Sequence, residues 1–191
     1  MDMEEYLRRS FEEYKNNVNR LIDEDSHKIF GNYSQRHAGF ITQRFVSLAQ
    51  NDVKLLAGSL IEDIYNRSVQ QAFADAVERL MPLNRKGAIR ILTLDNLEPP
   101  DWICELLRKS NETIQFKTYK ARVNGYHFLI VDGKRYRLEE PHEPLSGQKP
   151  QYNVKAEVCC NGPQKSEILS HFFDKLWSVV RNSTKVDEAG K

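Results

Sequence analysis

The sequence contains little cysteine, and this scarcity excludes several classes of protein. Its three cysteines, Cys104, Cys159 and Cys160, are too few for a disulfide framework, and neighbouring cysteines rarely bridge each other. No Cys-x-x-Cys pair is present to indicate a zinc site. We therefore expect a protein of a reducing compartment, the cytoplasm, with no metal and no cofactor.

Long hydrophobic runs are also missing. No apolar run approaches the ~18 residues that suggest a membrane-spanning helix, and the acidic N-terminal segment does not resemble a signal peptide. The net charge of +1 gives no global argument for a nucleic-acid or membrane partner. A length of 191 residues suffices for one domain with a proper core. We expect a soluble protein without a membrane partner.

Charge is unevenly distributed along the chain. Residues 1–25 hold eight acids against four bases, whereas residues 115–138 hold six bases against Asp132 alone. Such a run of charge is usually a solvated face. The alternative is a surface that binds phosphate or nucleic acid. The six bases are Lys117, Lys120, Arg122, Lys134, Arg135 and Arg137.

Residues 3–22 carry apolar side chains at helical spacing. Separations of seven and four residues place these side chains on one stripe of a helix. The stripe either packs on its own domain or docks on a protein partner, which could be a second copy in a homo-oligomer. The polar segment 23–35 is predicted to be a linker. The stripe consists of Leu7, Phe11, Tyr14, Val18 and Leu21.

Beyond this segment, predicted helices and strands alternate along the chain. A helix is expected over residues 34–50, with Ser34 as its N-cap. The hydrophobic pattern then predicts strands at 53–57, 88–94, 114–119 and 154–160, and helices at about 59–80, 100–107 and 165–180. This order is typical of an α/β fold with a mixed β-sheet flanked by helices.

The most informative segment covers residues 126–140. It reads as an apolar strand, a tight Asp132-Gly133 turn and a returning strand. The four residues 128–131 show no polar alternation, so both faces of this strand should be covered. We also expect the helix over 165–180 to pack on this strand.

This hairpin resembles the catalytic hairpin of the phospholipase D superfamily, whose motif is His-x-Lys, four residues, then Asp, usually followed by Gly. On this alignment the motif Asp is Asp132, the Lys position holds His127 and the position of the nucleophilic His holds Gly125. The resemblance implies a phospholipase D-like domain over residues 51–181. Residues 1–50 would be an N-terminal helical extension, and 182–191 a polar tail.

The resemblance also implies a reaction whose nucleophile this chain lacks. In the family, one His attacks phosphorus, a second protonates the leaving group, and two motifs come from two repeats or two chains. Only one motif half is present here. We therefore expect an inactive, pseudoenzyme-like binding or regulatory subunit of a larger complex, of a kind that would suit bacterial defence systems.

Two alternatives stay open. In the first, the chain is a homodimeric phosphodiesterase or nuclease that uses His127 or His142, with Glu140 nearby. His127, Arg137, Glu139, Glu140 and His142 would then form a polar cluster at one mouth of the sheet, although ion pairs that merely fix the hairpin explain the same residues. In the second, the basic strands 115–138 bind nucleic acid or a nucleotide without chemistry.

Overall fold

The structure is a computed structural model that describes residues 2–95, 98–119, 125–142 and 154–180. Seven strands and five α-helices, with one short 3-10 helix, are present in these ranges. The strands are β1 Ile29–Asn32, β2 Val53–Ala57, β3 Ile89–Thr93, β4 Ile114–Thr118, β5 His127–Val131, β6 Arg135–Glu139 and β7 Ala156–Cys159. The helices are α1 Met3–Asp23, α2 Gln35–Ser47, α3 Arg67–Leu80, η1 Met81–Leu83, α4 Asp101–Lys109 and α5 Pro163–Val179.

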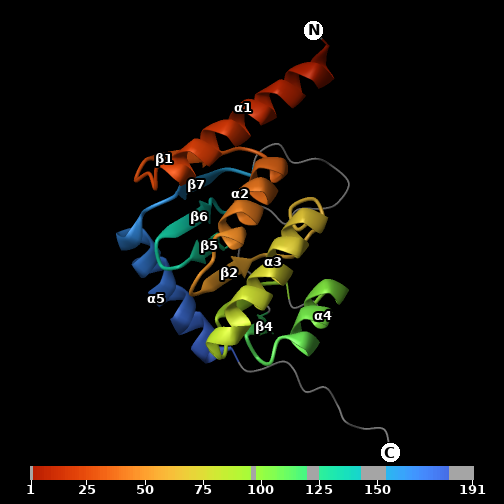
Figure 1. The fold of residues 1–191 in the computed structure, drawn as a ribbon, viewed down its shortest axis with the longest axis vertical. Helices are drawn as coiled ribbons and strands as arrows, with labels where there is room; N and C mark the ends of the chain where they lie inside the picture. The colour runs from red at the N-terminus through yellow and green to blue at the C-terminus, as the bar shows by residue number, and fades with distance from the viewer. Residues whose placement is uncertain (1, 96–97, 120–124, 143–153, 181–191) are drawn as a thin grey trace, which may run out of the picture.

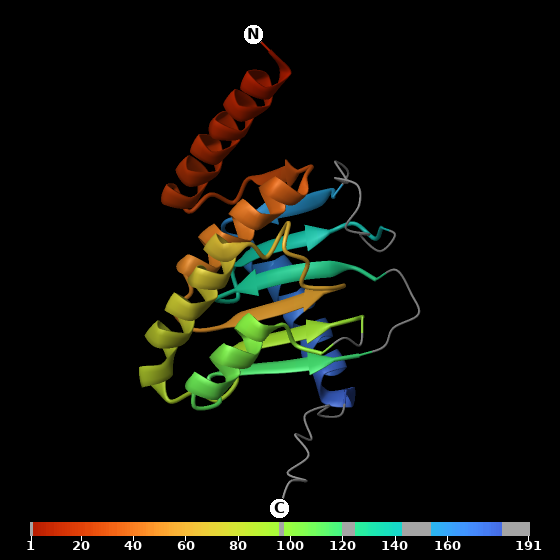
Figure 2. The ribbon, with the colours of Figure 1, turned by 90° about the vertical axis from the view of Figure 1, so that its right-hand side faces the viewer.

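The strands form one mixed sheet in the order β1-β7-β6-β5-β2-β3-β4. β2, β3 and β4 run parallel to one another, and every other pair of neighbours is antiparallel. Helices α2, α3 and α4 cover one face of the sheet and α5 covers the other (Figures 1 and 2). The predicted α/β fold with a mixed sheet flanked by helices is therefore confirmed.

Strand β5 lies in the interior of the sheet, between β6 and β2. Its alternate residues enter two separate cores: Phe128 and Ile130 pack toward α5 with Phe173, and Leu129 and Val131 pack toward α2 and α3. These four residues of β5 are each at most 1% exposed. The prediction that both faces of this strand are covered is confirmed.

Short polar side chains define where helices begin. The Ser34 hydroxyl accepts a hydrogen bond from the backbone N–H of His37 at 3.1 Å, as predicted for an N-cap. Asn66 caps α3 by accepting from the N–H groups of Ser68 and Val69. The helix after β2 therefore begins at Arg67, several residues later than its apolar pattern predicted. None of the helices in the described ranges combines the length and apolar character needed to cross a bilayer.

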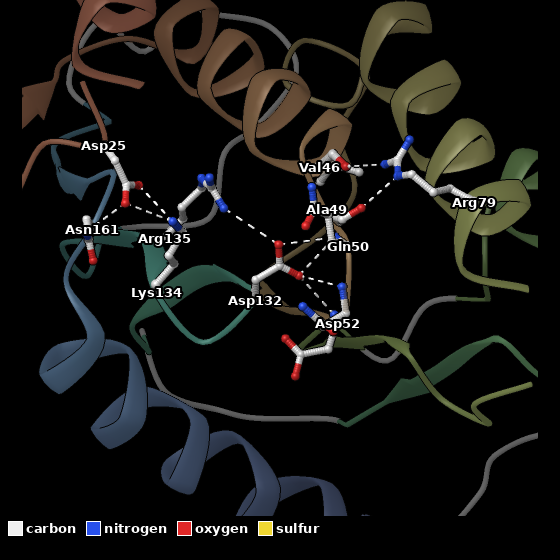
Figure 3. A network of polar contacts seen from close by, with 11 residues as sticks. Asp25, Val46, Ala49, Gln50, Asp52, Arg79, Asp132, Lys134, Arg135 and Asn161 are labelled. Carbon is white, nitrogen blue, oxygen red and sulfur yellow. Dashed lines mark hydrogen bonds and ion pairs between the residues drawn. The ribbon is translucent and has the colours of Figure 1, made fainter. Parts of the chain in front are cut away.

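The prediction that residues 23–35 form a linker is wrong. Residues 29–32 form edge strand β1, which pairs antiparallel with β7. Just before it, the Asp25 carboxylate accepts hydrogen bonds from Lys134 at 2.8 Å and Asn161 at 2.9 Å (Figure 3). A four-residue strand containing Gly31 has little apolar periodicity, and its partner strand lies more than a hundred residues further along the chain. Local sequence reasoning therefore had no signal for it.

Helix α1 is anchored from Phe11 onward, and most firmly by its C-terminal half. Val18 and Leu21 are at most 2% exposed and belong to the core shared with α2 and α3. The first turns of α1 project beyond the body of the protein (Figures 1 and 2). There Met3, Tyr6 and Leu7 are exposed.

The turn between β5 and β6 is fastened to the start of β2 by Asp132 (Figure 3). The Asp132 carboxylate accepts hydrogen bonds from the backbone N–H groups of Gln50, Asn51 and Asp52, at 3.0, 2.7 and 3.2 Å. Asp132 and Gly133 both adopt positive φ, 53° and 63°, within the three residues that connect the paired Val131 and Arg135. The Asp-Gly turn thus sets the hairpin register and also ties the hairpin to β2.

Replacing Asp132 should therefore destabilise the fold. In Asp132→Ala, three backbone N–H groups lose their acceptor, and we expect a loss of about 3 kcal/mol in the free energy of unfolding. Asp132→Asn is the matched control, because asparagine tolerates positive φ and keeps one acceptor oxygen. Urea denaturation should rank the variants wild type, Asn, then Ala. An equal loss for both variants would contradict this account.

Candidate functional site

His127 and Glu139 face each other across the hairpin. They are directly paired in the β5–β6 ladder, and they lie on the face of the sheet that α2 and α3 cover, since Leu129 of the same β5 face packs there. The His127 Nδ1 atom lies 3.0 Å from Glu139 Oε1. The hairpin register alone is thus enough to bring this pair together.

His142 joins the pair from the segment that follows β6. Its Nε2 atom lies 2.5 Å from the same oxygen, Glu139 Oε1. The rings of His127 and His142 meet edge to face, with centroids 5.3 Å apart. Two imidazole rings therefore converge on one carboxylate oxygen. We call His127, Glu139 and His142 the His–Glu–His cluster.

Arg137 binds the other oxygen of the Glu139 carboxylate, and Asn32 in turn holds Arg137. Arg137 donates from one terminal nitrogen to Glu139 Oε2 and from Nε to the side-chain oxygen of Asn32, at 2.7 Å for the second contact. Asn32 in turn donates to the carbonyl oxygen of Val154 at 2.9 Å. Asn32 lies on β1, in the segment predicted to be a linker, so sequence reasoning missed it. Its position depends on the long-range pairing of β1 with β7.

The cluster is largely withdrawn from water. The side chains of Glu139 and Arg137 are 4% and 7% exposed, and those of His127 and His142 are 18% and 16% exposed. Burial alone would raise the pKa of Glu139. The charge of Arg137 and the hydrogen bonds from the two histidines outweigh it, so the pKa of this carboxyl lies well below its usual range. Glu139 is therefore ionised at neutral pH.

Gly58 makes room for the His127 ring. A Cβ atom at position 58 would lie 2.9 Å from both Cε1 and Nε2 of His127. The Nε2 edge of this imidazole is therefore turned toward the backbone just after β2. A larger residue at position 58 would push the ring out of line with Glu139.

The arrangement lets each of the two imidazoles donate one N–H to Glu139 Oε1. His127 would then carry its proton on Nδ1 and His142 on Nε2. Such carboxylate-oriented imidazoles suit proton transfer, and the three converging atoms also have the chemistry of ligands for a small cation. The imidazole and carboxylate atoms all lie within 4.8 Å of one another.

Glu140 lies outside the cluster. Its side chain is exposed, and its backbone N–H donates to the carbonyl oxygen of Lys155 at 2.9 Å. Among the predicted catalytic residues, the structure thus brings His127 and His142 together through Glu139 rather than through Glu140. The alternation of β6 carries the signal for this choice, because Glu139 shares a face with Arg137.

The bases predicted to bind phosphate are engaged inside the protein where the structure describes them. Lys117 donates to the carbonyl oxygens of Trp177 and Val180 at the end of α5, and burial lowers the pKa of its ammonium group. Lys134 pairs with Asp25, Arg135 with Asp132 at 3.6 Å, and Arg137 with Glu139. Lys120 and Arg122 lie outside the described residues. A binding role for this set stays a prediction.

The predicted partner stripe on α1 is divided. Val18 and Leu21 pack into the core of their own chain, which confirms the simpler expectation for that half of the helix. Tyr14 stacks on His37 with ring centroids 3.8 Å apart, and Phe11 is half-buried beside them. Leu7 is 47% exposed. Docking of a partner therefore stays a prediction that concerns the first turns of α1.

Comparison with known proteins supports the fold. No protein-family model matches the sequence, and no curated protein matches it. Among solved structures, the phospholipase D family member Nuc from Salmonella typhimurium superposes with a TM-score of 0.57 at 15% identity, over 81% of this chain and 96% of Nuc. NucT from Helicobacter pylori gives 0.52 at 14% identity, over 81% and 99%. The chain therefore has a phospholipase D-like fold.

A third similar structure reaches further along the chain. TrmBL2, an archaeal chromatin protein whose structure shows a novel mode of DNA binding, superposes with a TM-score of 0.58 at 13% identity. The match covers 94% of this chain and 64% of TrmBL2, so the chain spans less than two thirds of that protein. Because 81% or more of the chain is matched in all three cases, each likeness extends into the first fifty residues. The resemblance drawn from sequence had excluded them.

Replacing Glu139 with a neutral residue should lower the free energy of unfolding, by an amount that depends on pH. In Glu139→Gln, Arg137 keeps a buried charge without its counterion, and we expect a loss of about 3–5 kcal/mol in the free energy of unfolding near pH 7. The pKa of Glu139 is lowered in the folded state, so its contribution is complete above the unfolded value of 4.5 and is lost as the pH falls below that value. The difference in the free energy of unfolding between wild type and Glu139→Gln should therefore be smaller at acidic pH than at pH 7.

Glu140→Gln is the matched control for this substitution, because it makes the same chemical change one residue away at an exposed position. We expect it to alter stability by less than about 0.5 kcal/mol. Chemical denaturation at several pH values measures both variants. Equal effects at positions 139 and 140 would contradict the role given to Glu139.

Proposed function

We propose that this chain is a phospholipase D-like binding subunit that does not hydrolyse phosphodiesters. One observation carries the proposal: the scaffold part of the motif is kept and the reactive part is replaced. Asp132 still fastens the hairpin to β2, whereas Gly125 offers no nucleophile and His127 stands at the position of the motif Lys. A fold can persist in this way after its chemistry is lost, because activity depends on the site rather than on the fold.

The contacts of the remaining imidazoles also support a non-hydrolytic role. A nucleophilic imidazole needs one nitrogen held and the other directed at the substrate. His127 has its Nδ1 held by Glu139, but its Nε2 edge is closely packed at Gly58. In the alternative of a homodimeric phosphodiesterase, this edge would have to open before His127 could act as the nucleophile.

A protein partner is the second element of the proposal. The exposed side chains Met3, Tyr6 and Leu7 lie on the projecting turns of α1, and soluble proteins seldom leave grouped apolar side chains uncovered without use. Val18 and Leu21 fix the other half of the helix in the core, so the exposed turns form a firmly held arm. We propose that this arm associates with a second copy of the chain.

Nucleic-acid binding is a second candidate function. It is favoured by the likeness to the DNA-binding TrmBL2 and by a polar cavity of about 320 Å³ at the start of β2 and β3, whereas the His–Glu–His cluster lies near the end of β2. Arg85, Lys86 and Arg90 line this cavity together with Trp177. We rank this function lower because Lys86 pairs with Glu112 and Arg90 with Asp174, which reduces the charge available to phosphate.

The proposal predicts that the purified full chain does not cleave phosphodiesters. In buffer with EDTA, release of p-nitrophenol from bis-(p-nitrophenyl) phosphate and cleavage of DNA should stay at the level of buffer alone, because the nucleophile is missing. His127→Ala should give the same background. Turnover by wild type that disappears in His127→Ala would overturn the proposal and favour the phosphodiesterase alternative.

Self-association should depend on the projecting turns of α1. Light scattering over a concentration series should show the wild-type mass rising toward that of a dimer. Replacing Tyr6 and Leu7 together with serine should weaken the dimer by about 2–4 kcal/mol, since each buried apolar side chain contributes roughly 1–3. Ile168→Ser, at another exposed apolar position on α5, is the control and should leave the dimer intact. A wild-type mass of one chain at every concentration would contradict self-association.

A further inference from the structure

We propose that the His–Glu–His cluster binds one divalent transition-metal ion, with Zn²⁺ as the expected ion. The ligands would be Nδ1 of His127, Oε1 of Glu139 and Nε2 of His142. This inference goes beyond the proposed function, because a binding subunit needs no metal and the sequence predicted none. It rests on the donor chemistry of the cluster, on its geometry and on the contacts that surround it.

The donor set matches the preference of zinc. Two imidazole nitrogens and one carboxylate oxygen are ligands that zinc sites use, and three protein ligands leave a fourth position for water. Ca²⁺ takes six or more oxygen ligands and Mg²⁺ prefers near-octahedral oxygen, so neither ion suits a site rich in nitrogen. The cluster should therefore select zinc and ions that behave like it.

The geometry needs an adjustment of about 1.5 Å at most, because the three ligand atoms all lie within 4.8 Å of one another. With metal–ligand distances near 2.0–2.1 Å, a tetrahedral ion separates two ligand atoms by about 3.3 Å. His127 Nδ1 already lies 3.0 Å from Glu139 Oε1. His142 Nε2, at 2.5 Å, must move away by less than one ångström. Because β6 ends at Glu139, His142 lies beyond the paired part of the strand, where such a movement costs little.

The metal would replace two hydrogen bonds. Each imidazole now directs a nitrogen at Glu139 Oε1, and in the metal complex that nitrogen offers its lone pair to the ion instead. The ring proton then sits on the other nitrogen, which is Nε2 for His127 and Nδ1 for His142. Each histidine stays neutral through this change of tautomer, so no net proton is lost from the cluster.

The surroundings hold the carboxylate in place. Arg137 binds Glu139 Oε2 and is itself held by Asn32, which leaves Oε1 directed at the two histidines. Such outer contacts orient the ligands of metal sites. The positive charge of Arg137 repels the incoming cation, whereas the negative charge of Glu139 attracts it.

Metal titration of the full chain tests the proposal. After dialysis against EDTA and removal of the chelator, calorimetry with Zn²⁺ should show one ion per chain, and Mg²⁺ should show no binding. Co²⁺ should give the visible absorption bands of a tetrahedral ion. The ultraviolet band of a cobalt–thiolate bond should be missing, which distinguishes this site from binding at Cys104, Cys159 or Cys160.

Variants locate the site. His142→Ala should weaken Zn²⁺ binding at least tenfold, because one of three ligands is lost. This residue lies beyond β6, so circular dichroism should show an intact fold. His171→Ala, which removes an exposed histidine on α5, is the matched control and should leave the affinity unchanged. His127→Ala provides a second ligand deletion with the same expected direction.

Two results would overturn the inference. One is the failure of wild type to bind Zn²⁺ in a one-to-one ratio. The other is an affinity that His142→Ala and His127→Ala, both folded, leave unchanged. Neither result bears on the proposed function, because phosphodiester cleavage is measured in EDTA. Conversely, cleavage in EDTA would overturn the proposed function and leave the metal site standing.

Discussion

The carboxylate of Asp132 is the contact on which the rest of this structure depends. Asp132 has left-handed backbone dihedral angles in the turn between β5 and β6. Its carboxylate accepts hydrogen bonds from three backbone N–H groups just before β2. A strand that slips by one residue turns all of its side chains to the opposite face. By fixing the register, Asp132 places His127 opposite Glu139 and keeps Phe128 and Ile130 in the core beneath α5.

A second carboxylate, Glu139, organises the polar end of the same hairpin. Its two oxygens have different partners: Oε2 binds the guanidinium group of Arg137, and Oε1 contacts the imidazole rings of His127 and His142. A buried arrangement of this kind contributes little to stability beyond what well-packed apolar residues would give, whereas breaking it is costly.

Local periodicity explains which parts of the fold could be predicted. Strands β2, β3, β4 and β5 and helix α5 carry their apolar patterns within a few residues, and the Asp-Gly turn has its own local signal. β1 could not be found in this way, because Gly31 interrupts a short edge strand whose partner is distant in sequence. The start of α3 was misplaced because Ile64 continues the apolar pattern before the Asn66 cap.

The candidate site was only partly predictable, for the same physical reason. His127 and His142 were identified from their positions near the hairpin, and Arg137 with Glu139 from the alternation of the returning strand. Glu140 was included although its side chain is exposed, and Asn32 was missed because only the β1–β7 pairing brings it to Arg137. Contacts that depend on distant strand pairing leave no trace in a local pattern.

The central claim is that two imidazole rings share one oxygen of an ionised Glu139. Long-range ¹H–¹⁵N correlation spectroscopy of the histidine rings near pH 7.5, with EDTA present, tests it most directly. The account predicts that His127 carries its proton on Nδ1 and His142 on Nε2, with assignments taken from His127→Ala and His142→Ala. Signals that report a mixture of both tautomers in each ring, as in solvent-exposed imidazoles, would contradict it.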